Sequence, residues 1–526
     1  MNAFAKKPYL GLLCCAFVLF NSTVAGRAAA ADPVAKPLPK ATTPAAVSEP
    51  NNDGETPDAV TSHSVTVNGV PIAYTARAGT ITVRNEQDQP TAHIFYTAYT
   101  TGSAATRPVT FIYNGGPGSS TMWLRMGSFG PVRVLAADGK PSGPAPYQIV
   151  DNPYSLIDKS DLVFIDMPDS GFGRILDPGK RKGFFGVDPD VAAFGQFMQR
   201  YLTQFGRWNS PKFIFGESYG TLRSAALADW LLNQGIALNG VILQSSILNY
   251  GLDYGNGDPI GGGDWPYVFY LPTEAATAWY HDKVRNKPAN LTTFLHDVEH
   301  FGLNEYLDAL SKGDRIGAAQ RDDVVRKLSY YLGVSQQYIR NSNLRVPYSR
   351  FLKEVGRSQG MIYGRLDGRY QTYDLDRAAE QPDWDATDSS IDAPYTAAVN
   401  HYLRADLKYT SPLQYRQNIY GIIYSDGKSW DFSHNKQYPL NAAPDLADAM
   451  TQNPNLQVFA ANGYYDFATP YFATVYTLKH LQLAAPLRGN ITYGFYPAGH
   501  MIYLNDAALA QYKDDLAHWY DRAQGR

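Results

Sequence analysis

The chain has 526 residues, a formal net charge of −3 at pH 7 and 44% hydrophobic residues. This length and apolar content are enough for a large buried core and exceed what a single minimal domain needs. The near-neutral balance gives no electrostatic basis for binding nucleic acid, so we expect no nucleic-acid partner.

Residues 1–31 are typical of a secretory signal peptide. Lys6 and Lys7 form a basic start, residues 9–20 form an apolar stretch, and mostly small residues follow over 25–31. The apolar stretch is too short to span a bilayer, although an uncleaved anchor is the alternative. We expect cleavage within 25–31, an exported protein that is periplasmic or secreted, and no stable membrane insertion after cleavage.

Both cysteines, Cys14 and Cys15, lie inside this leader. The mature chain would therefore have no thiol and no disulfide, and its stability would depend on the size of its core. Residues 32–60 follow, rich in Pro, Ala, Thr and Asn without apolar periodicity. This composition predicts a flexible linker.

Residues 61–248 combine two patterns. Short β-type runs occur first, at 65–67, 72–76, 79–84 and 93–99, with turn signals at Asn68-Gly69 and at 88–90. They predict an antiparallel meander. Apolar strands then alternate with helical patterns; the strands are 108–113, 162–167, 213–215 and 238–244, and the helices are 191–205 and 221–232. This alternation predicts a mostly parallel sheet covered by helices on both faces.

The alternation stops near residue 249. Helical patterns follow at 273–281, 291–310, 323–332 and 337–341, and then loops with Gly, Asp and Pro to about residue 426. We interpret 249–426 as a mostly helical insertion that caps the sheet. Residues 427–526 complete the first pattern, with strands at 457–461 and 491–496 and helices at 473–481 and 507–523.

The strand at 213–215 leads into Gly216-Glu217-Ser218-Tyr219-Gly220, and a helical pattern follows. This matches G-x-S-x-G, the nucleophile elbow, in the strand–turn–helix context that the motif requires. The two glycines permit the close backbone crossing of such a turn. We predict that Ser218 is a nucleophile at a helix N-terminus, where developing negative charge is favoured.

A nucleophilic serine needs a base, and the base needs an orienting acid. In this kind of hydrolase the chain order is Ser, then Asp or Glu, then His, with the last two on loops after the final strands. Asp466 follows the strand 457–461, and His500 follows the strand 491–496. We predict that Ser218, His500 and Asp466 are nucleophile, base and orienter, and that no metal or organic cofactor is needed.

Other residues compete for these roles. Asp426 and Asp448 are alternative acids, but neither follows a clear buried strand. His480 and His518 fall in helical patterns, which favours surface or packing roles.

The strand 108–113 runs into Asn114-Gly115-Gly116-Pro117-Gly118-Ser119-Ser120. The loop lacks the Lys-Ser/Thr of a P-loop and the spacing of a dinucleotide fingerprint. In a serine hydrolase such a loop supplies a backbone N–H to the oxyanion hole, although a simple tight turn is the alternative. We predict that the N–H groups of Gly116 and Tyr219 bind the oxyanion.

Taken together, these motifs resemble the serine carboxypeptidase family. The matching stretches, in the family's order, are 114–120, Asn152-Pro153-Tyr154-Ser155, Gly171-Phe172, 216–220, and the loops of Asp466 and Gly499-His500. They cover nearly all of 109–503 apart from the cap. The resemblance implies a secreted bacterial member with an α/β-hydrolase fold, which removes C-terminal residues from peptides with a free C-terminus.

The resemblance also implies how a free C-terminus is recognised. In the family, the loop Asn and the Glu before the nucleophile bind the substrate carboxylate, which corresponds here to Asn114, the N–H of Gly115 and Glu217. A Glu can bond a carboxylate only when it is protonated, which predicts better binding at acidic pH. A solvated Glu217 at the helix start is the alternative.

This sequence departs from the family at two positions. The family's second Glu corresponds to Ser128, and no Glu occurs between Glu86 and Glu217; the family's Cys in the glycine-rich loop corresponds to Ser119. Without the second Glu, we expect peptidase activity that tolerates higher pH than is usual for the family. A pH–rate profile on an N-blocked dipeptide with a sharp maximum below about pH 4.5 would contradict this expectation.

Three other functions stay open. The same triad could serve an esterase or an acyltransferase, because the fold does not decide the function. His296-Asp297-Val298-Glu299-His300 fits H-x-x-E-H, a zinc-peptidase pattern, but no third ligand can be identified. A non-catalytic binding protein on the same scaffold is the third.

Overall fold

The structure is a computed structural model that describes residues 56–102, 106–252, 263–424, 430–436 and 439–525. The expected signal peptide with Cys14 and Cys15, the expected linker up to residue 55, and Asp426 lie outside these ranges. Within the described ranges, no helix has the length and apolar content to cross a membrane.

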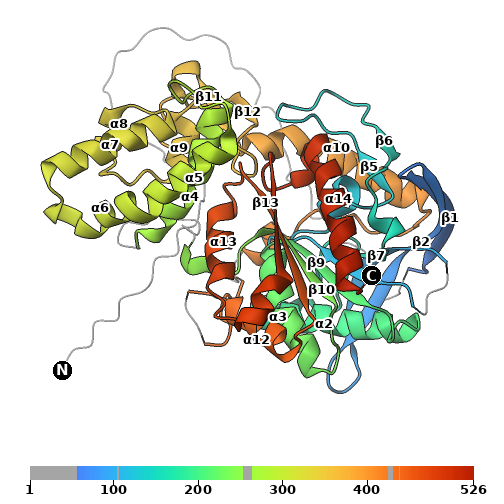
Figure 1. The fold of residues 1–526 in the computed structure, drawn as a ribbon. Helices are drawn as coiled ribbons and strands as arrows, with labels where there is room; N and C mark the ends of the chain where they lie inside the picture. Colours follow the sequence, from blue (N-terminus) through green and yellow to red (C-terminus); the bar gives the residue numbers. More distant parts are fainter. Residues whose placement is uncertain (1–55, 103–105, 253–262, 425–429, 437–438, 526) are drawn as a thin grey trace, which may run out of the picture.

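A ten-stranded sheet forms the centre of the described chain (Figure 1). Its order is β1-β2-β3-β7-β4-β9-β10-β13-β14, with β8 beside β3. The strands are β1 (Ala59–Val67), β2 (Val70–Arg84), β3 (Pro90–Thr100), β4 (Val109–Tyr113), β7 (Asp161–Ile165), β8 (Arg174–Ile175), β9 (Lys212–Ser218), β10 (Gly240–Ser246), β13 (Gln457–Gly463) and β14 (Ile491–Tyr496). β1 to β3 are antiparallel, and all neighbouring pairs from β7 to β14 are parallel.

The N-terminal meander has fewer strands than the sequence predicts. The runs 72–76 and 79–84 form one continuous strand, β2. Gly79 does not interrupt it, because it pairs with Tyr96 of β3. A Cβ at Gly79 would lie 1.8 Å from the Asp58 carboxylate, which pairs with Arg77 at 2.8 Å. The glycine therefore makes room for an ion pair and does not mark a turn.

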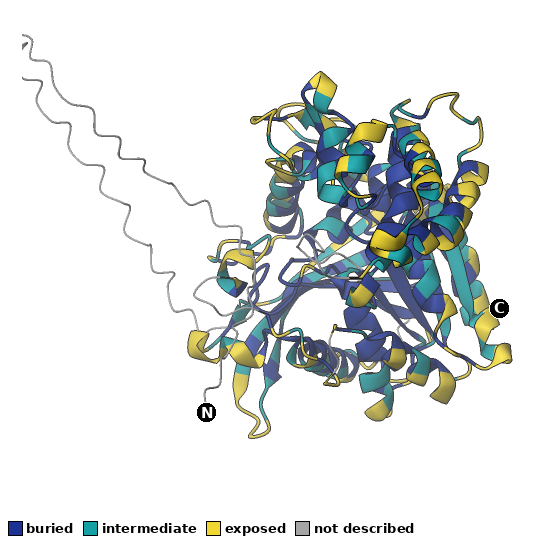
Figure 2. Ribbon diagram, turned by 90° about the vertical axis from the view of Figure 1, so that its left-hand side faces the viewer, coloured by how far each residue is buried: buried dark blue, intermediate teal, exposed yellow. Residues whose placement is uncertain are grey.

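Helices cover both faces of the sheet, so that the strands are buried between them (Figure 2). One apolar cluster contains Phe194 of α2 (Val187–Gln204), Leu222 of α3 (Tyr219–Asn233) and Leu446 of α12 (Ala443–Gln452). The cluster on the opposite face contains Met126 of α1 (Met122–Gly127) and Trp519 of α14 (Asp506–Ala523). A mostly parallel sheet between two helical layers is the α/β-hydrolase fold, as predicted.

The stretch 265–373, which lies between β10 and β13, is mainly helical and gathers beside α13 (Tyr471–Lys479) (Figure 1). It contains α4 (Trp265–Tyr280), α5 (Leu291–Phe301), a π-helical turn (Gly302–Tyr306), α6 (Leu307–Lys312), α7 (Ala318–Leu332), α8 (Gln336–Asn341), α9 (Tyr348–Glu354) and a hairpin of β11 (Met361–Tyr363) and β12 (Gln371–Tyr373). These helices share a third apolar cluster with Phe467 and Phe472.

The expectation of loops up to about residue 426 is wrong, because a 16-residue helix, α10 (Ala386–His401), lies within that stretch. Its first turns are rich in Asp, Ser and Thr, and Pro394 lies inside it, which obscures the helical pattern. The side chain of Asp385 accepts the Thr387 N–H and caps the helix. Ile391 and Tyr395 join the core cluster of α1 and α14, and this tertiary burial stabilises the helix.

We expect Trp519→Ala to destabilise the fold by about 3–5 kcal/mol, because it empties a fully buried site between α14 and the sheet. The Trp519 ring lies 5.7 Å from the ring of Phe213 and 6.0 Å from that of Phe459. Denaturant unfolding measures the change. Trp208→Ala, at a tryptophan that is 48% exposed, is the matched control and should change stability by about 0.5 kcal/mol or less. Equal losses in the two variants would contradict this assignment.

Candidate active site

Ser218 ends β9 in a backbone conformation that is rare for a residue with a side chain. Its φ is 61° and its ψ is −131°, and α3 begins at the next residue. At Gly216, a Cβ would lie 2.1 Å from the carbonyl oxygen of Gly220, so strand and helix cross too closely for any side chain there. The sharp turn leaves Ser218 partly exposed at a helix N-terminus, while the rest of β9 is buried.

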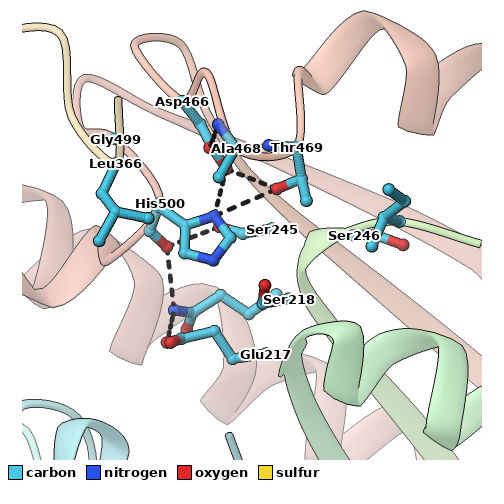
Figure 3. A network of polar contacts seen from close by, with 12 residues as sticks. Glu217, Ser218, Ser245, Ser246, Leu366, Asp466, Ala468, Thr469, Gly499 and His500 are labelled. Carbon is cyan, nitrogen blue, oxygen red and sulfur yellow. Dashed lines mark hydrogen bonds and ion pairs between the residues drawn. The ribbon is translucent and has the colours of Figure 1, made fainter. Parts of the chain in front are cut away.

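The structure brings His500 and Asp466 together from the loops that follow β14 and β13. The Nδ1 of His500 lies 2.9 Å from an Asp466 carboxylate oxygen, and both residues are buried. Figure 3 shows Ser218 on the opposite side of the imidazole from Asp466. Among the hydrogen bonds of the described residues, none joins the Ser218 hydroxyl to His500. Such bonds are often long in a free enzyme and shorten when substrate binds.

Asp466 is held by three hydrogen bonds besides the one to His500. One carboxylate oxygen accepts the N–H of Ala468 at 2.8 Å and of Thr469 at 3.0 Å. The other accepts the Thr469 hydroxyl at 2.7 Å. A fully buried carboxylate would be costly without such donors. The loop therefore fixes the carboxylate that orients the imidazole.

The pKa of His500 is raised. Burial alone would lower it, but the negative charge of Asp466 and the hydrogen bond to it outweigh burial. The surroundings of His500 thus favour the protonated imidazolium form of its side chain.

The glycine-rich loop lies directly against the elbow. A Cβ at Gly115 would lie 2.5 Å from the Tyr219 nitrogen and 2.6 Å from the Gly220 nitrogen. Arg223 of α3 donates to the Asn114 carbonyl at 2.9 Å and pairs with buried Asp190 at 2.7 Å, which anchors the loop. The predicted oxyanion donors, Gly116 and Tyr219, therefore belong to two backbone segments that pack together.

Asn114 and Glu217 also come together. The Asn114 amide donates to one carboxyl oxygen of Glu217 at 2.6 Å, and the Gln244 amide donates to the other at 2.6 Å. Glu217 is 2% exposed, so the alternative of a solvated residue is wrong. Burial raises the pKa of Glu217 to about 7, against the opposing effects of His500 and the Asn114 hydrogen bond. A neutral carboxylic acid can thus persist close to neutral pH.

Ser128, in place of the family's second Glu, brings no acid to the site. It is buried at the end of α1 and donates to the Leu124 carbonyl at 2.6 Å. Asn152 of the Asn-Pro-Tyr-Ser stretch donates to the Ser128 carbonyl at 2.6 Å and to the Gly130 carbonyl at 2.8 Å. This family motif therefore shapes the turn after α1.

The competing residues lie elsewhere in the described structure. His296 is mostly exposed on α5, and Glu299 accepts the Tyr471 hydroxyl. In the described ranges, no group of three or more His, Cys, Asp or Glu side chains could hold a metal ion. Asp448 is exposed on α12, and His480 and His518 are exposed with their rings bonded to nearby backbone carbonyls.

Three further residues bond the site, and the sequence motifs point to none of them. The Ser245 hydroxyl donates to the His500 carbonyl at 2.6 Å, and Gln244 bonds Glu217. Both lie at the end of β10, where polar side chains reach the edge of the sheet that carries the loops of Asp466 and His500. Thr469, three residues after Asp466, could have been found as a short-range partner of a buried carboxylate.

The elbow and the glycine-rich loop lie inside a stretch that is recognisable in known proteins. Residues 69–257 match the serine carboxypeptidase family. The predicted resemblance to this family is thereby confirmed over that stretch.

Individual family members are distant relatives. Serine carboxypeptidase-like 45 from Arabidopsis thaliana is 26% identical over 210 residues, which are 37% of this chain. Pheromone-processing carboxypeptidase KEX1 from Saccharomyces cerevisiae is 32% identical over 171 residues, which are 30% of this chain. The chain spans 42% and 22% of the lengths of these two relatives.

Among solved structures, a proline iminopeptidase from Mycobacterium smegmatis overlaps 88% of this chain and 98% of its own. Its identity is 12% and its TM-score is 0.33, so this likeness carries no weight for function.

We expect Asp466→Asn to lower the pKa of His500, because the charge and the hydrogen bond of Asp466 raise it. Titration of the imidazole by NMR measures the pKa directly. Asp448→Asn, at an exposed carboxylate on α12, is the control and should leave the pKa unchanged. A pKa that does not fall in Asp466→Asn would contradict the assigned pair.

Proposed function

We propose that the protein is a serine carboxypeptidase that hydrolyses C-terminal residues from peptides. The observation that carries this proposal is the shared site of a strained Ser218 turn, a His500–Asp466 pair and a buried Asn114–Glu217 pair. In this proposal residues 61–248 and 427–526 form the catalytic domain, and residues 249–426 form a cap that shapes the substrate pocket.

The reaction would follow from these positions. His500 accepts the Ser218 proton through Nε2, since its Nδ1 is engaged with Asp466. The serine oxygen attacks the carbonyl carbon of the last peptide bond, and the N–H groups of Gly116 and Tyr219 bind the resulting oxyanion. The imidazolium then protonates the leaving amine. Water hydrolyses the acyl-enzyme with His500 again as base. In this mechanism the catalytic groups of every step are residues of the chain.

Recognition of the free C-terminus would rest on Asn114, the Gly115 N–H and Glu217. With its pKa raised to about 7, Glu217 is protonated below that pH and can donate to a carboxylate. Above it, the ionised side chain repels the same group. This supports activity that extends to higher pH than the acidic range expected for a pair of glutamates.

An esterase or acyltransferase with the same triad is the second candidate. Ser128 favours it, because this position supplies no second acid for a carboxylate-binding pair. We also propose that the protein is exported and acts in the periplasm or outside the cell, because residues 1–31 are typical of a signal peptide. This proposal concerns its place of action and not its substrate.

The deciding experiment uses N-blocked dipeptides with varied C-terminal residues, together with an ester that lacks a free carboxylate. We expect hydrolysis of the dipeptides, labelling by a fluorophosphonate, and loss of both in Ser218→Ala, because its hydroxyl forms the acyl-enzyme. Equal cleavage of the ester would favour the esterase. Inhibition by a chelator without fluorophosphonate labelling would favour the zinc alternative, and neither labelling nor turnover would favour a binding protein.

We expect KM for the blocked dipeptides to rise as the pH passes about 7, because Glu217 then loses the proton with which it binds the substrate carboxylate. Glu217→Gln should abolish this rise, since an amide does not ionise. KM measured between pH 5 and pH 9 at constant ionic strength tests both statements. Glu86→Gln, at an exposed carboxylate, is the control and should keep the wild-type dependence. A rise that persists in Glu217→Gln would exclude Glu217 as its source.

A further inference from the structure

The loop between β11 and β12 contacts both segments that carry the acid and the base. Four hydrogen bonds form this contact: His500 N–H to the Leu366 carbonyl at 2.6 Å, Gly499 N–H to the Asp367 carboxylate at 3.1 Å, Phe467 N–H to the Arg365 carbonyl at 3.0 Å, and Gly368 N–H to the Tyr465 carbonyl at 2.9 Å. Figure 3 shows Leu366 and Gly499 beside His500. Residues 365–368 thus bond His500 itself and both chain neighbours of Asp466.

These four residues are themselves held firmly. Asp367 is fully buried and forms an ion pair with buried Arg369 at 2.6 Å. Arg369 also pairs with Asp138 at 2.6 Å, and the Asp367 N–H donates to the Thr387 hydroxyl at 3.0 Å. Charge-assisted bonds between buried groups are among the strongest and most directional in proteins. Asp367 therefore presents its carboxylate to Gly499 from a fixed position.

The start of α10 anchors the same loop. The carboxylate of Asp385 accepts the N–H groups of Arg365 and Leu366, each at 3.0 Å, and also caps α10 through the Thr387 N–H at 2.8 Å. One carboxylate therefore ties the loop to a helix that is packed in the core of the sheet.

The β11–β12 loop packs so closely on its neighbours that no side chain fits at Gly499 or Gly368. A Cβ at Gly499 would lie 2.4 Å from the Asp367 Cβ and 2.5 Å from its Cα. A Cβ at Gly368 would lie 2.4 Å from the Thr277 hydroxyl oxygen of α4. The two segments also bond each other, Tyr465 N–H to the Ala498 carbonyl at 3.0 Å. Residues 365–368 therefore add further hydrogen bonds to two segments that already contact each other, at His500 and at the neighbours of Asp466.

We propose that Asp367 is a positioning residue of this site: through Gly499 and through its ion pair with Arg369, it sets the place of His500 relative to Asp466 and Ser218. The inference rests on the proposed peptidase function. It assigns the stretch between β10 and β13 a part in aligning the catalytic groups, in addition to covering the sheet. Displacements of about 1 Å at reacting groups can lower rates by about two orders of magnitude, so such alignment matters for turnover.

The test compares Asp367→Asn with Asp161→Asn. Asp161 is also a buried carboxylate paired with a buried arginine, Arg207 at 2.6 Å, but it lies at the start of β7, at the opposite end of the strand from the loops. We expect kcat for a blocked dipeptide to fall at least about tenfold in Asp367→Asn with KM within about twofold, and both to stay near wild type in Asp161→Asn. Circular dichroism and thermal unfolding report whether each variant is folded.

A second readout does not depend on turnover. The charged side chains that act on the imidazole of His500 include Asp466, Glu217, Arg365 and Asp388, and all four remain in the variants. A loosened contact with Asp466 should lower the pKa of His500, measured by NMR titration of the ring. Because Asp367→Asn also removes a charge, Thr387→Val tests position without a change of charge, since it removes the hydroxyl that accepts the Asp367 N–H at 3.0 Å and donates to the Asp367 carbonyl at 3.4 Å. We expect Thr387→Val also to lower the pKa of His500, and to lower kcat by about threefold, which is less than in Asp367→Asn.

Unchanged kcat and unchanged His500 pKa in both Asp367→Asn and Thr387→Val would overturn the proposal, as would an equal loss of kcat in folded Asp161→Asn. If the wild-type protein does not cleave blocked dipeptides, the proposed function fails, and the imidazole titration still decides the positioning role. If Asp367→Asn does not fold, Thr387→Val decides it.

Discussion

The close crossing of β9 and α3 at Gly216 and Gly220 is the constraint on which the site depends. It forces Ser218 into its strained turn and leaves this residue partly exposed at the N-terminus of α3. The same crossing leaves a narrow space that only Gly115 can occupy, so the glycine-rich loop packs on the elbow. Arg223, one turn into α3, then holds that loop through the Asn114 carbonyl. One backbone contact thus arranges three functional segments.

Buried carboxyl groups around His500 are each stabilised in a different way. Asp466 receives hydrogen bonds from its own loop and from the imidazole. Glu217 lies between two amides, and its burial favours the neutral acid. Asp367 is paired with Arg369. Since an isolated buried charge is costly, each carboxyl group needs such partners, and the three arrangements fit the uses proposed for them: orientation of His500, proton-dependent binding and fixed structure.

Much of the fold follows from local patterns, and the exceptions have physical causes. The strands β4, β7, β9, β10, β13 and β14 are predicted by periodicity and composition, because each contains a mainly apolar run. The helix α10 escapes such reasoning because Pro394 and the polar first turns weaken its intrinsic preference, while burial of Ile391 and Tyr395 stabilises it. The runs 72–76 and 79–84 are expected as separate strands, but β2 continues through Gly79, where the absent side chain leaves room for Asp58.

By itself, the sequence determined the strand–turn–helix at Ser218, the glycine-rich loop and the order of the loops that carry Asp466 and His500, because each is a pattern of neighbouring residues. Only the tertiary structure decided that Glu217 is buried against Asn114, 103 positions away, and that Asp367 bonds Gly499, 132 positions away. Contacts across such separations leave no local periodicity in a sequence. They arise when the packing of the sheet and its helices brings distant loops to one edge, where burial then sets which groups carry charge.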